Sequence, residues 1–256
     1  MVKISLVVIT YNEAHNIRRC LESAADIVDE ILVVDSASTD ATVAIAESFG
    51  SRVIIQPFLG YVAQKRFAIS QARYPVVLSL DADEALSEAL RQSIAGVRAK
   101  WSHDCYFMNR LSSIGGSWIR HGGWYPDRKM RLFDRGKYAV EGIDPHDKFV
   151  PVPGASSARL IGDILHYTNG DIAGRAATVN QFSTLAARAF NERGKRGSLG
   201  RLLFKPFFRF VVEYFFRRGF LDGFYGFVVA MTSAQYVFLR EAKLIELQRE
   251  RKSTVD

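Results

Sequence analysis

The sequence has little cysteine and no long apolar run. Its 256 residues include two cysteines, Cys20 and Cys105, without CxxC spacing, which indicates neither a disulfide framework nor a cysteine zinc site and predicts two buried free thiols. The apolar run at residues 4–10 is too short for a signal peptide and is typical of a strand. A membrane-spanning helix needs about 20 apolar residues, and the stretch 224–239 is shorter and contains three polar residues. We therefore expect a cytoplasmic protein.

A glycine motif is also missing. No GxGxxG follows residues 4–10, where a dinucleotide-binding dehydrogenase would carry it, so a nicotinamide cofactor is not indicated. The composition, with 48% hydrophobic and 24% charged residues, is that of a folded globular chain. The length suits one substantial α/β domain, with or without a smaller appended element.

Three short apolar, β-branched runs predict strands that are buried on both faces, as in a parallel sheet. Apolar residues at helical spacing predict the connecting helices. The predicted strands are residues 4–10, 31–34 and 76–80, and the predicted helices are residues 13–25, 40–49 and 63–72. This βαβαβ order indicates a doubly wound α/β fold.

The pattern changes near the middle of the chain. Residues 101–168 mix short strand patterns with glycine and proline, whereas the remainder of the chain has a helical pattern. We therefore expect a catalytic domain at residues 1–170, in two halves at 1–100 and 101–170, and a helical region at 171–256.

Polar side chains follow each predicted strand. Ligands of open parallel sheets bind beyond the carboxyl ends of the strands, so these polar ends can converge on one crevice. Asp81 and Asp83 follow residues 76–80, and strand alternation would point both carboxylates to the same side. Such a pair suits Mg²⁺ or Mn²⁺, which would neutralise the charge on a diphosphate leaving group. The alternative is a solvated acidic cluster that caps a helix beginning near Ser87.

The other two strand ends also carry acids. Asp35 can accept hydrogen bonds from the base or ribose of a nucleotide. Asp40 fits a similar role or the N-cap of the following helix. Glu13 fits a ligand contact or a first-turn acid that the helix dipole favours.

Four segments in this order and spacing resemble the family 2 glycosyltransferases of the GT-A fold: ITYNE at 9–13, VVDSASTDAT at 33–42, QKRFA at 64–68 and LDADE at 80–84. The later RLFDRG at 131–136, His146 with Asp147, His166 with Tyr167 and the aromatic C-terminal segment resemble the lipopolysaccharide-core glucosyltransferases of that family. The resemblance covers nearly the whole chain. It implies a GT-A-type, Rossmann-like, mostly parallel sheet with flanking helices and a helical, aromatic C-terminal extension.

The resemblance implies a nucleotide-sugar site in the first half, residues 1–100, and an acceptor site in the second. The implied nucleotide-sugar-binding residues are Thr10, Tyr11, Glu13, Asp35, Ser38, Lys65, Asp81, Ala82, Arg128 and Arg131. The implied ligands of a divalent Mg or Mn ion are Asp83, Asp81 and His166. Three alternatives stay open: Lys65 on a solvated helix face, His166 as a structural residue, and Arg128 and Arg131 paired with local acids.

An inverting transfer needs a base that takes the proton of the acceptor hydroxyl as it attacks the sugar. The resemblance aligns the family's His-Glu pair with His146 and Asp147, so the catalytic candidates are Asp147 and Glu141. Asp144 is an alternative on the same loop. Any of these acids can instead make turn hydrogen bonds.

Positive charge is concentrated near the C-terminal aromatic residues. The formal net charge is +7, and residues 188–218 hold nine Lys or Arg against two Glu. Anionic lipid headgroups attract such basic segments, and interrupted apolar helices lie at the interface of a membrane rather than across it. We expect the helical region to bind an anionic membrane surface. A helical pair packed on the core, or a dimer interface, are the alternatives, and the oligomeric state stays open.

The resemblance then implies transfer of glucose from UDP-glucose to a hydroxyl of a lipid-linked saccharide, such as a lipopolysaccharide core, at the inner face of the cytoplasmic membrane. One rival is a polyprenyl-phosphate sugar synthase, which would use the same donor site. Another is a non-catalytic protein that binds a membrane surface or nucleic acid, suggested by the basic aromatic region. Since the second rival leaves the acids at three strand ends unexplained, we expect no nucleic-acid partner.

Overall fold

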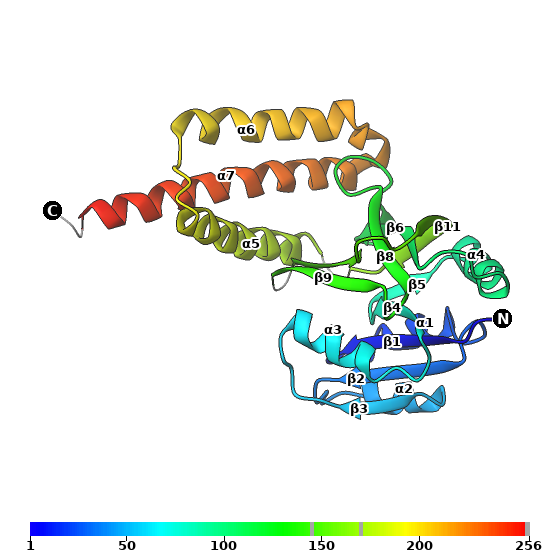
Figure 1. Ribbon diagram of the computed structural model, residues 1–256. Coiled ribbons are helices and arrows are strands. Elements are labelled where there is room, and N and C mark those ends of the chain that lie inside the picture. The colour runs from blue at the N-terminus through cyan, green and yellow to red at the C-terminus, as the bar shows by residue number, and fades with distance from the viewer. Residues whose placement is uncertain (144–145, 169–170, 254–256) are drawn as a thin grey trace. The chain divides into compact units, whose positions relative to one another are not determined.

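The computed structural model describes residues 1–143, 146–168 and 171–253, without the side chains of 142, 143, 146, 147 and 251–253. The chain forms two compact units (Figure 1). The first comprises Met1–Leu111 and Asp127–Tyr167, and the second comprises Ser112–Pro126 and Thr168–Asp256. Residues 112–126, which the sequence places in the second half of the catalytic domain, therefore group with the C-terminal helices.

One sheet forms the frame of the first unit. Its parallel strands are β1 (Ile4–Thr10), β2 (Glu30–Asp35), β3 (Arg52–Ile55) and β4 (Val76–Asp81). The later strands of this sheet are β5 (Glu84–Leu86), β6 (Cys105–Ile114), β8 (Asp127–Asp134) and β11 (Ser157–His166). Strands β9 (Tyr138–Ile143) and β10 (His146–Pro151) form a separate two-stranded sheet, and the short β7 (Ser117–Trp118), in the second unit, pairs with β6. The order is β3-β2-β1-β4-β8-β6-β11-β5, with antiparallel pairing of β4 to β8, β8 to β6 and β11 to β5. The predicted α/β class and the predicted parallel strands are confirmed.

Helices cover both faces of this sheet, because the strands are apolar on both sides. The helices of the first unit are α1 (Ile17–Glu22), α2 (Thr42–Ser48), α3 (Tyr61–Ser70) and α4 (Glu88–Ala99). On β1, Leu6 and Val8 point into a core that includes α1, α2 and α4, whereas Val7 points into a second core with α3 and the β9–β10 hairpin. Cys20 and Cys105 are buried free thiols, as predicted.

The first helix is shorter than the sequence predicts. Residues 13–16 form a turn before α1, and the backbone N–H groups of Glu13 and Ala14 donate to Thr42 Oγ1 at 2.8 Å and Asp40 Oδ2 at 3.1 Å. The interpretation of Glu13 as a first-turn helical acid is therefore wrong. Instead, the start of α2 anchors the segment that carries Glu13.

The second unit is mainly helical, as the sequence predicts. Its helices are α5 (Ile172–Glu192), α6 (Leu199–Val211), a π-helical turn at Val212–Phe216, a 3-10 turn at Gly219–Asp222 and α7 (Gly223–Ser253). Ile114 and Ile119 pack with Val229 of α7, and Arg175 of α5 lies 4.9 Å from the ring centroid of Trp124. Trp124 is thus part of the packing in this unit. Among the helices in the described part of the chain, none is long and apolar enough to cross a membrane.

Candidate active site

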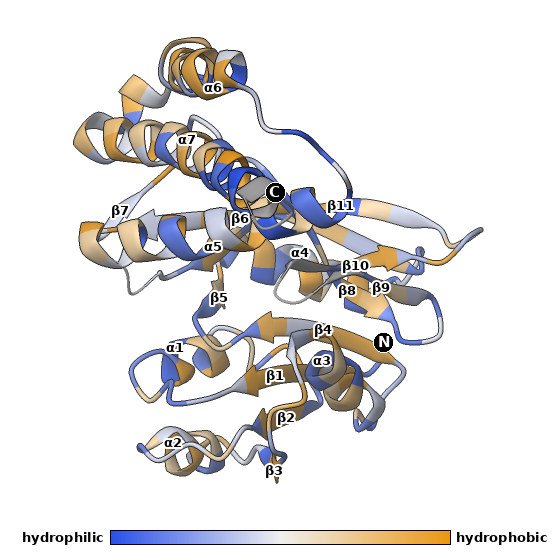
Figure 2. Ribbon diagram, turned by 90° about the vertical axis from the view of Figure 1, so that its left-hand side faces the viewer, coloured by the Kyte–Doolittle hydropathy of each residue, from blue (hydrophilic) through white to orange (hydrophobic). Residues whose placement is uncertain are grey.

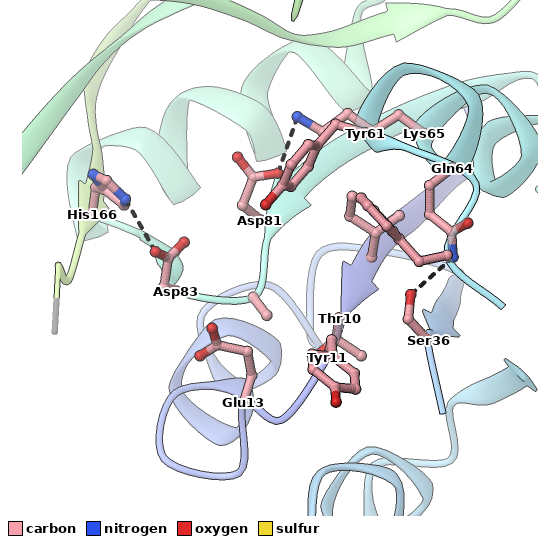
Figure 3. A pocket seen from close by; sticks show the side chains of 13 residues that line it. Thr10, Tyr11, Glu13, Ser36, Tyr61, Gln64, Lys65, Asp81, Asp83 and His166 are labelled. Carbon is pink, nitrogen blue, oxygen red and sulfur yellow. Dashed lines mark hydrogen bonds and ion pairs between the residues drawn. The ribbon is translucent and has the colours of Figure 1, made fainter. Parts of the chain in front are cut away.

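The first unit contains a cavity of about 650 Å³ beyond the carboxyl ends of β1, β2 and β4 (Figure 3). Its walls come from these strand ends, from α3 and the segment before it, and from the end of β11. The lining residues are Ile9, Thr10, Tyr11, Glu13, Ser36, Phe58, Tyr61, Gln64, Lys65, Asp81, Ala82, Asp83 and His166. The polar ends of the three predicted strands therefore meet at one crevice.

The acidic segment after β4 is a tight turn rather than a continued strand. Strand β4 ends at Asp81, and Ala82 and Asp83 form the turn that leads to β5. Strand alternation therefore does not place the two aspartates. The turn still brings both carboxylates to the cavity wall (Figure 3). The helix that follows is capped by Ser87, whose hydroxyl accepts from Leu90 N at 3.3 Å, so the acids are not its cap.

Asp81 is held by two cations. Its carboxylate lies 2.6 Å from Arg131 Nη2 and 3.4 Å from Lys65 Nζ. Burial raises the pKa of Asp81, but the charges of Arg131 and Lys65 outweigh burial and hold the pKa well below its ordinary value. Asp81 is therefore an anion at neutral pH. Lys65 is only 11% exposed and faces this carboxylate, so its alternative interpretation as part of a solvated helix face is wrong.

Asp83 forms a separate pair with His166. His166 Nε2 lies 3.1 Å from Asp83 Oδ2, and both side chains line the cavity. Within the described residues, no three His, Cys, Asp or Glu side chains gather as a metal cluster, because Asp81 turns to its cations. A carboxylate, an imidazole and substrate oxygens nevertheless suit a Mg²⁺ or Mn²⁺ ion, which commonly takes one or two protein carboxylates together with phosphate oxygens. The donor set therefore fits such an ion.

Glu84 does not begin a helix. It lies on β5 with its side chain fully buried, where it accepts from Asp81 N at 3.0 Å and from Arg131 Nη2 at 2.9 Å. Arg110 Nη1 lies 3.5 Å from the same carboxylate. Glu84 thus ties the acidic turn to Arg131 from behind the cavity wall.

The last residue of β1 and the loop after it supply Thr10, Tyr11 and Glu13 to the wall. Thr10 is buried, and its hydroxyl has no hydrogen-bond partner among the described residues, so a bound ligand can satisfy it. Tyr11 is 58% exposed at the rim. Burial raises the pKa of Glu13, and the negative charge of Asp83 raises it further, while a hydrogen bond from Asn16 opposes both.

Asp35 and Ser38 shape the neighbouring loop but do not line the cavity. Asp35 is fully buried at the end of β2 and accepts from the backbone N–H of Ser38 at 2.7 Å and from its hydroxyl. Ser38 Oγ in turn accepts from Asn12 N at 2.8 Å. Asn12 and Ala37 both have positive φ, at 53° and 64°. Positive φ is unfavourable for residues with a side chain, so the contacts around these two adjoining loops must stabilise this backbone conformation.

Apart from Lys65, sequence reasoning missed the residues that α3 and the preceding segment bring to the cavity. Phe58 and Tyr61 form an edge-to-face pair with ring centroids 5.1 Å apart, and both are about half exposed. Gln64 is fully buried and donates to Ser36 Oγ at 3.2 Å, so it fixes α3 against the loop after β2. Such paired rings at a nucleotide-sized cavity offer a stacking surface. The signal was present in the aromatic residues before QKRFA.

Arg128 and Arg131 do not line this cavity. Both lie on β8 and line a second cavity of about 530 Å³ in the first unit. Arg131 is buried between Asp81 and Glu84, which supports its alternative interpretation as a structural partner of local acids. Lys65 and Asp81 line both cavities.

The candidate bases lie on the β9–β10 hairpin. Glu141 is exposed, lies 3.2 Å from Lys148 Nζ and lines neither of the two cavities. Asp147 lies opposite Gly142 in the hairpin register, but its side chain is outside the described residues, and Asp144 is outside them altogether. Their catalytic roles stay predictions.

Known proteins resemble this chain over most of its length. A Rickettsia felis protein named "Uncharacterized glycosyltransferase" is 36% identical over 272 residues, which cover 100% of this chain and 94% of the relative. The lipopolysaccharide core biosynthesis glycosyltransferase LpsC of Rhizobium meliloti is 32% identical over 254 residues, covering 95% of this chain and 92% of the relative.

A solved structure of glucosyl-3-phosphoglycerate synthase from Mycobacterium tuberculosis, with Mn²⁺, UDP and glucosyl-3-phosphoglycerate, matches with a TM-score of 0.36 and 22% identity over 45% of each chain. Residues 5–149, more than half of the chain, match the family described as Glycosyl transferase family 2. Together with the relatives that align over nearly the full length, this match shows that the chain belongs to the family 2 glycosyltransferases.

Proposed function

We propose that the protein is an inverting glycosyltransferase that transfers glucose from UDP-glucose to a hydroxyl of a lipid-linked saccharide such as a lipopolysaccharide core. The observation that carries the proposal is that one cavity, beyond the ends of the parallel strands, is lined by Asp81, Asp83, His166 and Lys65 together. Membership of the family supports sugar transfer. The relationship to the lipopolysaccharide core glycosyltransferase of Rhizobium meliloti supports the acceptor class.

Each wall of the cavity has a part in this proposal. Phe58 and Tyr61 offer rings for the nucleobase, and the unpartnered hydroxyl of Thr10 offers a hydrogen bond. Asp83 and His166 would hold the divalent ion, which when bound supplies positive charge to the diphosphate. Asp81, whose pKa is depressed, pairs with Lys65 at 3.4 Å and positions it at the cavity wall. These contacts would bind the donor and orient it for attack.

The transfer itself needs a carboxylate on the acceptor side. The acceptor oxygen would bond to the anomeric carbon as the bond to the nucleoside diphosphate breaks, and the hydroxyl proton would pass to the base. We assign this base to Asp147, with Glu141 as the second candidate. If Asp147→Asn keeps full activity and the product is labile in mild acid, the polyprenyl-phosphate sugar synthase is favoured instead, because a phosphate acceptor needs no base.

A donor screen tests the proposal. We expect UDP-glucose with Mn²⁺ to raise the unfolding midpoint by about 5 °C or more, because a ligand at 100 times its Kd stabilises a protein by about 2.7 kcal/mol. The measurement is thermal unfolding with UDP-, GDP- and dTDP-sugars, each with Mn²⁺ and each with EDTA. EDTA should remove most of the shift. If none of the nucleotide sugars shifts the unfolding midpoint, the proposed donor chemistry is wrong.

The second unit carries an exposed apolar and basic surface that suits a membrane. We name it the α6 surface and define it by Leu203, Phe204, Phe207 and Phe208, all more than 60% exposed, with the basic residues on the same helix. In Figure 2, where α6 is seen nearly end-on, much of the helix has the hydrophobic colour, with hydrophilic segments between. Aromatic side chains next to Lys and Arg favour the interface of an anionic bilayer. We infer a protein that is peripheral on the cytoplasmic face of the membrane.

Vesicle binding tests this surface. We expect the full chain to co-float with vesicles that contain phosphatidylglycerol, and the triple change of Phe204, Phe207 and Phe208 to serine to weaken binding more than about tenfold, because each buried aromatic contributes about 1.5–3 kcal/mol. Ile161→Ser is the matched control, since Ile161 is 79% exposed on β11 of the first unit. If the triple variant binds vesicles normally but changes its sedimentation coefficient, the α6 surface is a dimer interface.

A further inference from the structure

The second cavity of the first unit is strongly basic. It encloses about 530 Å³ and shares Lys65 and Asp81 with the candidate donor cavity. Asp81 is the only acid among its lining residues in the described part of the chain. The positively charged lining residues are Lys65, Arg110, Arg128, Lys129, Arg131 and Lys148.

Local acids balance this charge only in part. Asp127 lies 2.9 Å from Arg110 and 3.2 Å from Lys129, so one carboxylate serves two cations. Arg128 is exposed and makes no ion pair with any residue that the structure describes. Among the side chains that the structure describes, the nearby acids are Asp81, Glu84, Asp127 and Glu141, four against six cations. The cavity thus keeps an excess of positive charge.

The environment of the half-buried Lys129 also favours an anionic ligand. Burial lowers the pKa of Lys129, and the charge of Arg110 lowers it further, while Asp127 raises it. A buried ammonium next to a guanidinium is destabilised by both effects, and a bound anion would relieve them. An anionic ligand therefore stabilises the charged ammonium of Lys129 more than it would stabilise that of a solvated lysine.

Apart from the shared Lys65 and Asp81, the lining of this cavity is separate from the donor contacts. The pair that suits a metal ion, Asp83 with His166, lines only the first cavity. Arg128, Lys129 and Lys148 line only the second. The divalent ion that Asp83 and His166 would hold serves the donor diphosphate, and the excess charge of the second cavity is left for another anion.

We propose that the second cavity is the acceptor subsite and that it binds a phosphate group of the acceptor through Arg128, Lys129 and Lys148. The proposal rests on the proposed function, because it takes the first cavity as the donor site. Guanidinium and ammonium groups around a cavity of this size match a phosphate in charge and hydrogen-bonding capacity. The phosphate can belong to a phosphorylated saccharide or to a lipid phosphate. Both sources offer the same group to the cavity.

Binding of small phosphates tests the proposal. Glucose 6-phosphate, geranyl phosphate and unphosphorylated glucose are titrated into the full chain by calorimetry, with and without UDP and Mn²⁺. We expect at least one phosphate to bind, glucose not to bind, and the affinity to fall as salt is raised. Preference for the sugar phosphate indicates a phosphorylated saccharide acceptor, and preference for geranyl phosphate indicates a lipid phosphate.

Two variants and a control locate the binding. The Arg128→Ala, Lys148→Ala double variant changes exposed residues, so we expect it to fold normally, to lose phosphate affinity about tenfold or more, and to keep UDP affinity within about twofold. Lys129→Gln should weaken phosphate binding as well. The control is the double change of Arg73 and Lys100 to alanine, which removes one Arg and one Lys from exposed positions of the same unit.

Three results would overturn the assignment. One is that neither phosphate binds the native protein although UDP does. Another is that phosphate binds equally well to the Arg128, Lys148 variant and to the control. The third is that the variant loses UDP and phosphate together, which would make these residues part of the donor site. If UDP itself fails to bind the native protein, the proposed function fails, and that result is separate from the other three.

Discussion

Sugar transfer is expected to fall about 1,000-fold when Asp83 is replaced by asparagine, a loss of about 4 kcal/mol of transition-state stabilisation. The asparagine oxygen can still accept from His166, which lies 3.1 Å from the carboxylate, so the change removes charge rather than shape. A neutral amide is a poor ligand for Mg²⁺ or Mn²⁺ compared with a carboxylate. The measurement is the rate of product formation from radiolabelled UDP-glucose.

The matched control for this variant is Asp26→Asn. Asp26 is in the same unit, and its side chain is 59% exposed and paired with Arg91 on the surface, so its activity should stay within about twofold of the native rate. The Asp83 variant should also lose the Mn²⁺-dependent part of the thermal shift while keeping its unfolding midpoint without ligand. An Asp83→Asn protein that transfers sugar at near-native rate would rule out Asp83 as a metal ligand.

The parallel part of the fold could be predicted from the sequence because its strands are buried on both faces. The apolar runs that become β1, β2 and β4 need no alternation and so stand out from their polar ends. Since polar strand ends meet at one edge of a parallel sheet, the convergence of Thr10, Ser36 and Asp81 on one cavity followed from the same pattern. Helix α1 was predicted too long because apolar spacing cannot show that Glu13 is anchored to α2.

Contacts between segments that are distant in the chain could not be predicted from the sequence. The sequence shows Arg131 and Glu84 as separate charged residues, and the antiparallel pairing of β4 with β8, together with the turn from β4 to β5, brings them together. The pairing of Phe58 with Tyr61 depends on where α3 begins, and Tyr61 is its first residue. Likewise, the basic second cavity joins residues of α3, β6, β8 and β10. Charge and aromatic content were visible, but their partners depend on the tertiary fold.

Replacing Glu84 with glutamine is expected to lower the free energy of unfolding by about 3–5 kcal/mol, because it removes one of the two carboxylates that pair with the buried Arg131. Glu84 is fully buried, accepts from Arg131 at 2.9 Å and lies 3.5 Å from Arg110. Arg131 is 4% exposed and cannot turn to water. The measurement is urea unfolding followed by circular dichroism, with the midpoint and the slope both compared with the native protein.

Glu88→Gln is the control, since Glu88 has an exposed side chain on α4 and pairs only with surface groups, so its change should stay within about 0.5 kcal/mol. Adding Arg131→Met to Glu84→Gln should restore part of the loss, because it removes the buried charge that the first change left with Asp81 but without Glu84. A Glu84 variant as stable as the control would mean that Asp81 alone compensates Arg131. The acidic turn would then keep its shape without Glu84, and Asp83 would owe its position to His166 and to the backbone bond from Tyr167.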